Sequence, residues 1–153
     1  MHKLIIADTS SLIVFNKINQ IDILKKVYNE IAITPEILNE FELPVPDWIK
    51  IIKVNNKKYQ GLIETQLDLG ESSVIALAIE IEDSLLILDD LKARKYAQRL
   101  GLKFTGSLGV INKAKEMGVI DKVKPIIDEL KNTDFRISDK IIHNILERND
   151  EWE

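Results

Sequence analysis

The chain has 153 residues, of which 45% are apolar and 30% charged, a balance typical of one soluble globular domain and unlike that of disordered or collagen-like chains. No apolar run approaches the ~20 residues that cross a bilayer, and Leu4–Ala7 is too short for a signal-peptide core, so we expect neither a membrane span nor secretion. The sequence has no cysteine and two histidines, which excludes disulfides and thiolate chemistry, argues against a His-rich zinc site and fits a cytoplasmic location.

Apolar runs alternate with helical patterns along the whole chain. Thr9-Ser10-Ser11 supplies helix N-cap chemistry after the first run, and Thr34-Pro35 places an N-cap before a proline at the first helical position. In chain order we expect strand Leu4–Ala7, helix Leu12–Ile18 continued over Gln20–Tyr28, strand Ile31–Ile33, helix Glu36–Phe41, strand Trp48–Val54, polar connection Asn55–Lys58, buried helix Glu71–Glu82, strand Leu85–Leu88, a basic helix through about Leu100, strand Leu102–Thr105, helix Ser107–Met117, and helices at about 121–131 and 138–148.

Five strands separated by helices predict a mainly parallel sheet with helices on both faces, a three-layer α/β/α sandwich. The runs Leu4–Ala7 and Leu85–Leu88 are apolar throughout, so we expect them to be the central, neighbouring strands. We expect residues 1–153 to form a single domain.

Acidic residues follow two of these strands at the point where each strand ends. Asp8 follows the first strand and Asp89-Asp90 the fourth, while Glu40 lies on the helix after the second strand and Glu71 in the first turn of the buried helix. The functional crevice of a parallel sheet lies beyond the carboxyl ends of its strands. Clustered carboxylates repel one another and suit a hard cation such as Mg²⁺, so the sequence predicts a metal site.

Each acid also has a structural explanation. Glu71 and Glu36 could favour the positive end of a helix, and Glu40 could belong to a solvated helix face. Either Asp89 or Asp90 could cap the following helix. Asp8 is the hardest to explain in this way, because an acid directly after a buried strand should face the crevice.

Positive charge is concentrated in one segment of an otherwise acidic chain. The net charge is −4, but residues 91–115 contain seven basic residues and no acid. This segment begins directly after Asp90, so its side chains could bind phosphates of a nucleic acid near the acidic crevice. At helical spacing Lys92, Lys95 and Arg99 share a face and are the candidates, whereas Arg94 points elsewhere. An ordinary solvated helix face is the alternative.

At these residues the chain resembles the PIN-domain nucleases, the fold of VapC-type toxins. The pieces that carry the resemblance are Asp8-Thr9-Ser10, Thr34-Pro35-Glu36 leading to Glu40, Leu69-Gly70-Glu71, and Leu88-Asp89-Asp90 followed by Lys92-Ala93-Arg94. The stretches Thr105–Val110 and Phe135–Asp139 resemble a particular, poorly characterised PIN subfamily. Two departures from the family pattern stand out. Glu71 occupies a position where many relatives have Asp, and Leu88-Asp89-Asp90 replaces the usual Thr-x-Asp, which leaves the fourth acid open between Asp89 and Asp90.

The resemblance implies a Mg²⁺- or Mn²⁺-dependent endoribonuclease whose metal-binding acids are Asp8, Glu40, Glu71 and Asp90 (or Asp89), with Thr9 and Ser10 as polar support. It implies hydrolysis by an activated water that leaves a 5′-phosphate and a 3′-hydroxyl. RNA would be the substrate. A toxin of this class would be expected to have an antitoxin that lays a peptide across the crevice. A second copy of the chain, forming a homodimer, is a further possible partner.

Three alternatives use the same features differently. A non-catalytic PIN-like module would bind RNA or a protein and keep its acids as remnants, and metal-dependent cleavage separates it from an enzyme. A receiver domain normally has paired acids after its first strand and a phosphorylatable Asp after its third, whereas here Val54 leads into Asn55-Asn56. A phosphatase with Asp-x-Asp is disfavoured because Ser10 occupies the second position.

Overall fold

The computed structural model describes residue 2 and residues 4–152, so the first, third and last residues of the predicted 1–153 domain lie outside the described part of the chain. Its sheet contains five strands in the order β3-β2-β1-β4-β5, and every pairing is parallel. The strands are β1 (Leu4–Ala7), β2 (Ile31–Ile33), β3 (Ile49–Ile51), β4 (Ser84–Ile87) and β5 (Lys103–Thr105). The predicted parallel sheet of an α/β/α fold is therefore confirmed.

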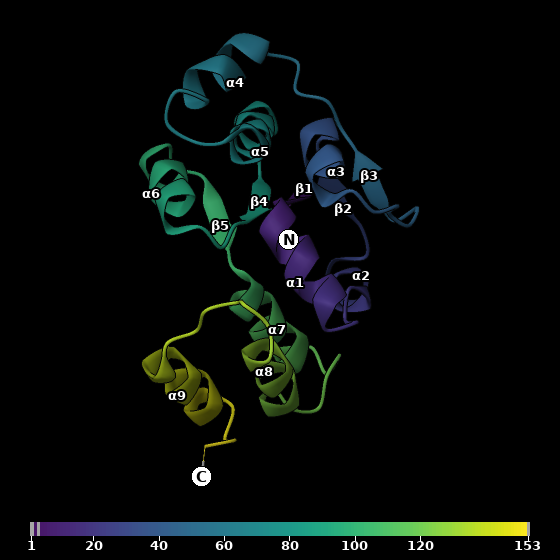
Figure 1. Ribbon diagram of the computed structural model, residues 1–153, viewed down its shortest axis with the longest axis vertical. Helices are drawn as coiled ribbons and strands as arrows, with labels where there is room; N and C mark the ends of the chain where they lie inside the picture. The colour runs from purple at the N-terminus through teal and green to yellow at the C-terminus, as the bar shows by residue number, and fades with distance from the viewer. Residues whose placement is uncertain (1, 3, 153) are drawn as a thin grey trace.

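Helices follow the strands and surround the sheet. They are α1 (Thr9–Lys17), α2 (Asp22–Tyr28), α3 (Pro35–Phe41), α4 (Lys57–Ile63), α5 (Leu69–Glu80), α6 (Leu91–Arg99), α7 (Ser107–Glu116), α8 (Lys124–Lys131) and α9 (Asp139–Arg148). In Figure 1, α3, α4 and α5 gather at one end of the molecule and α7, α8 and α9 at the other, with α1 between the two groups. Within the described residues, no helix has both the length and the apolar character that a membrane span requires.

The centre of the sheet is the pairing of β1 with β4, as predicted. Ile6 lies opposite Leu86 in a continuous four-residue register, and both side chains are fully buried. Helix α5 packs against these two strands and is buried over Val74–Ala78, because its sequence leaves almost no polar face. The carboxyl ends of β1 and β4 are thus held rigidly side by side.

Four predicted elements need correction. The helix expected to continue from Leu12–Ile18 over Gln20–Tyr28 is two separate helices, α1 and α2. The polar segment Asn55–Lys58 is not a simple connection but the start of α4, and the Asn56 side chain caps this helix by accepting from Tyr59 N. Helix α1 begins at Thr9 rather than Leu12, with Asp8 at its N-cap position. The strand expected over Trp48–Val54 pairs only at Ile49–Ile51, at the edge of the sheet.

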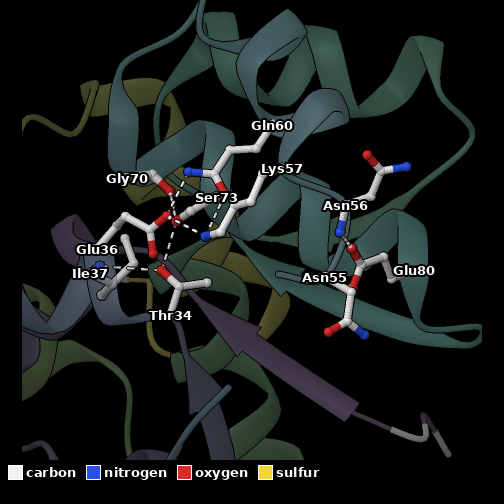
Figure 2. A network of polar contacts seen from close by, with 10 residues as sticks. All are labelled: Thr34, Glu36, Ile37, Asn55, Asn56, Lys57, Gln60, Gly70, Ser73 and Glu80. Carbon is white, nitrogen blue, oxygen red and sulfur yellow. Dashed lines mark hydrogen bonds and ion pairs between the residues drawn. The ribbon is translucent and has the colours of Figure 1, made fainter. Parts of the chain in front are cut away.

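Polar contacts fix α3 and α4 relative to α5 (Figure 2). The buried hydroxyls of Thr34 and Ser73 lie 2.6 Å apart and join the start of α3 to α5. Glu36 accepts from Gln60 Nε2 at 2.5 Å and from Lys57 Nζ at 3.4 Å, which ties α3 to α4. Glu36 therefore has a structural role, and α3 and α5, which carry Glu40 and Glu71, are held in a defined relation.

Candidate metal centre

An open cavity of about 420 Å³ lies beyond the carboxyl ends of β1 and β4. Its lining residues are Asp8, Thr9, Ser10, Ile13, Glu40, Asp68, Glu71, Asp89, Asp90 and Phe135. The cavity thus brings together every acid that the sequence singled out for metal binding, together with both predicted support residues. Their role as ligands stays a prediction.

Asp8 lies at the base of this cavity. Its backbone N–H donates to the Ile87 carbonyl at 3.1 Å, which extends the β1–β4 pairing by one residue, and the residue is 4% exposed. Burial raises the pKa of Asp8 to about 7 from an ordinary value of 3.8; the Thr9 backbone opposes the rise, and the charges of Glu71, Asp68 and Glu40 add to it. Near neutral pH this carboxyl is therefore poised between its two protonation states.

Glu40 reaches the cavity from α3 and is held by two neighbours. Thr9 Oγ1 donates to Glu40 Oε1 at 2.6 Å, so the first residue of α1 orients the carboxylate. On the other side the carboxylate lies against Gly70 so closely that a Cβ at this position would overlap both of its oxygens. A residue with a Cβ at position 70, in the first turn of α5, would therefore displace the Glu40 carboxylate.

Replacing Gly70 with alanine should displace Glu40 without unfolding the protein, since a flexible carboxylate can move aside. We expect Mn²⁺ affinity to fall about tenfold or more, as for other changes that disturb ligand orientation, while the free energy of unfolding rises by up to about 1 kcal/mol from helix propensity. Gly61→Ala in α4 is the matched control, because nothing lies within 4 Å of its Cβ position. Equal Mn²⁺ affinity in both variants, measured by calorimetry, would show that Glu40 is not a ligand.

Glu71 and Asp68 form the rim of the cavity at the start of α5. Asp68 is the N-cap residue, and its Oδ1 accepts from Glu71 N at 2.8 Å. Burial, with a further contribution from the charges of Asp68, Asp90 and Glu40, raises the pKa of Glu71 to about 7, and a hydrogen bond from the backbone of Asp68 opposes the rise. Asp68 was not among the acids expected at the site from the sequence, although an acid three residues before Glu71 is a helix-start signal that could have placed it here.

Asp89 and Asp90 differ in how their oxygens are used. Asp89 accepts from Ser107 N at 2.7 Å and from Ser107 Oγ at 2.6 Å, so each of its oxygens has a partner. Asp90 caps α6 with Oδ2, which accepts from Ala93 N at 2.9 Å. The charge of Asp90 also acts on Glu71. Asp90 therefore lines the cavity with one carboxylate oxygen, Oδ1, that capping does not use.

The donor chemistry suits a divalent cation, although two of the four carboxylates, those of Glu40 and Asp90, already accept hydrogen bonds from Thr9 and from Ala93. Oxygen ligands from four acids are what Mg²⁺ or Mn²⁺ prefers, and no basic residue among those described lines the cavity to offset the charges of these acids. Burial is the main cause of the raised pKa values of Asp8 and Glu71, and the charges of the neighbouring acids add to it. Within residues 2 and 4–152, no three acidic or histidine side chains yet have the spacing of a formed metal site. Metal binding would therefore require these side chains to move closer together within the cavity.

The predicted phosphate-binding residues lie outside this cavity. Lys92, Lys95 and Arg99 are exposed on α6, while Ala93 and Ala97 form its buried face. The shared, solvent-facing side expected for the three basic residues is thus present. Arg94 is turned away from them, as expected. It is half-buried and lines a second cavity together with Asp89.

The comparisons with known proteins agree with this geometry. A family model described as a PIN domain matches residues 4–151, nearly the whole chain. No curated protein matches the chain. The order of the strands, the cavity at their carboxyl ends and the extent of the match lead to one assignment: the chain belongs to the PIN-domain family.

Proposed function

We propose that the protein is a metal-dependent endoribonuclease in which Asp8, Glu40, Glu71 and Asp90 hold Mg²⁺ or Mn²⁺. PIN domains are generally nucleases and usually use divalent metals. The observation that supports the proposal most is the convergence of these four acids, from β1, α3, α5 and the start of α6, on one cavity. Four carboxylates brought together in this way repel one another unless a cation joins them.

The chemistry follows from the residues that line the cavity. A bound cation would lower the pKa of the attacking water and offset charge that develops on the phosphate oxygens. Thr9 orients Glu40, and Asp68 fixes the backbone at Glu71. We assign the fourth ligand to Asp90 rather than Asp89, because both oxygens of Asp89 already accept from Ser107.

The test is a cleavage assay on mixed RNAs with Mn²⁺, Mg²⁺ or excess chelator. We expect cleavage with either metal and none with chelator, with products that carry 5′-phosphates. Cleavage in excess chelator would point to another mechanism or a contaminating nuclease. If no RNA is cleaved although RNA is bound, the protein is the non-catalytic binding module instead.

We further propose that the exposed basic residues Lys92, Lys95 and Arg99 bind phosphates of the RNA along α6. Replacing Lys95 and Arg99 with alanine should weaken binding similarly for different sequences and reduce the salt dependence, since log affinity changes by roughly 0.7 per phosphate contact for each log unit of salt on single strands. Mn²⁺ affinity should not change, because these side chains are not ligands. An unchanged salt slope, measured by fluorescence anisotropy, would make this surface an ordinary solvated helix face.

The resemblance to VapC-type toxins extends the proposal to the toxin of a toxin–antitoxin pair that acts in the cytoplasm. An antitoxin would cover the acidic cavity, and a homodimer would present two such cavities. Expression in a bacterial host tests this role: the intact protein should stop growth, whereas Asp8→Asn should not. Normal growth with the intact, soluble protein would separate the chain from the toxins.

A further inference from the structure

We propose that a second cavity, next to the acidic one, binds a phosphate group of the RNA strand whose cleavage is proposed above. The inference rests on that function and names a subsite for it. Its basic residues are Arg94 and Arg136, which differ from the exposed basic residues of α6. Arg136 belongs to the Phe135–Asp139 stretch, which the proposed metal chemistry leaves without a role.

The second cavity has a volume of about 370 Å³ and adjoins the first. The two share Asp89 and Phe135 in their walls. The remaining lining residues are Arg94, Thr105, Gly106, Leu108, Gly109, Arg136 and Ile141. A strand with one phosphate at the acids could therefore place a neighbouring phosphate here.

Arg94 is held in this wall without a partner for its charge. Its guanidinium lies 4.9 Å from the centre of the Phe104 ring, a cation–π contact that fixes its plane. Its Nε is buried and has no hydrogen-bond acceptor. Among the described residues, no carboxylate forms an ion pair with Arg94 or Arg136. A buried donor without an acceptor is unfavourable, so the site favours an incoming anion.

The neighbouring acid does not fill this role. Both oxygens of Asp89 accept from Ser107 at the start of α7. A Cβ on Gly106 would lie 2.9 Å from Asp89 Oδ1 and 3.8 Å from Arg94 Nη1. Gly106 has φ −110, which any residue can adopt, so the glycine is needed for space rather than for its backbone. Because it has no Cβ, Gly106 leaves room between the Asp89 carboxylate and the Arg94 guanidinium.

Two kinds of side chain in the wall of the second cavity suit a nucleotide, since Asp89 already occupies the start of α7. A planar guanidinium binds phosphate oxygens through two parallel hydrogen bonds, which lysine cannot imitate. The half-buried Phe135, in the wall of both cavities, offers a ring on which an RNA base could stack.

Fluorescence anisotropy with a labelled single-stranded RNA, in chelator so that no cleavage occurs, tests the proposal. Arg94→Gln/Arg136→Gln should weaken binding about tenfold or more and lower the salt slope by roughly 0.7 per lost phosphate contact. Arg136 is exposed, so Arg136→Gln alone should fold normally and show part of the effect. Arg94→Lys, which keeps the charge but loses the planar fork, should also bind more weakly. Arg148→Gln is the control, because Arg148 pairs with Glu116 away from both cavities.

Two arms separate the possible results. RNAs with a 5′-phosphate or a 5′-hydroxyl distinguish a terminal phosphate from an internal one, and a loss with either RNA supports the subsite. Mn²⁺ affinity should be the same in all variants. If the double variant has the affinity and salt slope of the wild type, the phosphate subsite is wrong, whether or not the wild type cleaves RNA. An acidic protein segment would then be the candidate occupant of the second cavity. An intact protein that binds no RNA would overturn the subsite as well.

Discussion

Asp8→Asn should lower the rate of metal-dependent RNA cleavage about 10²–10³-fold, a loss of roughly 3–4 kcal/mol of transition-state stabilisation. The amide occupies the same space at the end of β1 but cannot supply a charged oxygen to the cation. Because the residue is 4% exposed and no charged partner is removed with it, the chain should remain folded. Initial rates of RNA cleavage at saturating Mn²⁺ measure the effect.

Asp128→Asn on α8 is the control, since this exposed acid does not line the cavity. It makes the same chemical change and should retain the wild-type rate. Thermal unfolding of both variants shows whether a lost rate reflects lost structure. A folded Asp8→Asn variant that cleaves at the wild-type rate would remove Asp8 from the metal site.

The metal-free protein should lose stability as the pH rises from about 4 to 7. The pKa of Asp8 is about 7 in the folded chain against 3.8 ordinarily, mainly because the carboxyl is buried. Between these values the folded state binds more protons than the unfolded state, so the free energy of unfolding falls as pH rises. The contribution of Asp8 to this decrease is complete above pH 7. For Asp8 this amounts to about 2–4 kcal/mol. Glu71 contributes in the same direction, less strongly because it is more exposed.

The comparison of wild type with Asp8→Asn isolates this contribution from other titrating groups. Urea unfolding in chelator should show equal stability near pH 4, and at pH 8 the variant should be more stable by about 2–4 kcal/mol. Added Mg²⁺ should stabilise the wild type at pH 8, because a cation that binds the folded state compensates the ionised acids. A difference between the two proteins that does not change with pH would contradict the assigned pKa of Asp8.

The sequence predicted the parts of the site that lie next to regular elements. Asp8 directly follows a strand-like apolar run, Asp90 comes two residues after another, and Glu71 lies in the first turn of a helix with almost no polar face, so their positions at one sheet edge follow from the parallel topology. Glu40 needed the resemblance to a family, because a glutamate in the second turn of a helix is equally typical of a solvated face.

Features that depend on packing between distant segments could not be predicted in the same way. Helix α4 begins in a polar stretch whose capping residue, Asn56, is also typical of loops. The contact between Gly70 and Glu40 joins residues 30 positions apart, and neither residue alone indicates it. Arg94 was separated from its basic neighbours by helical geometry, but its placement over Phe104, in the wall of the second cavity, depends on how α6 packs against β5.

The central claim is that the four acids hold a divalent cation, and Mn²⁺ binding measured by titration calorimetry tests it most directly. At pH 7.5 the wild type should bind Mn²⁺ in the absence of RNA. Asp8→Asn should bind at least tenfold more weakly, because it loses a charged ligand, and Asp128→Asn should bind as the wild type does. The same Mn²⁺ affinity in Asp8→Asn as in the wild type, or no Mn²⁺ binding by the wild type, would contradict the claim.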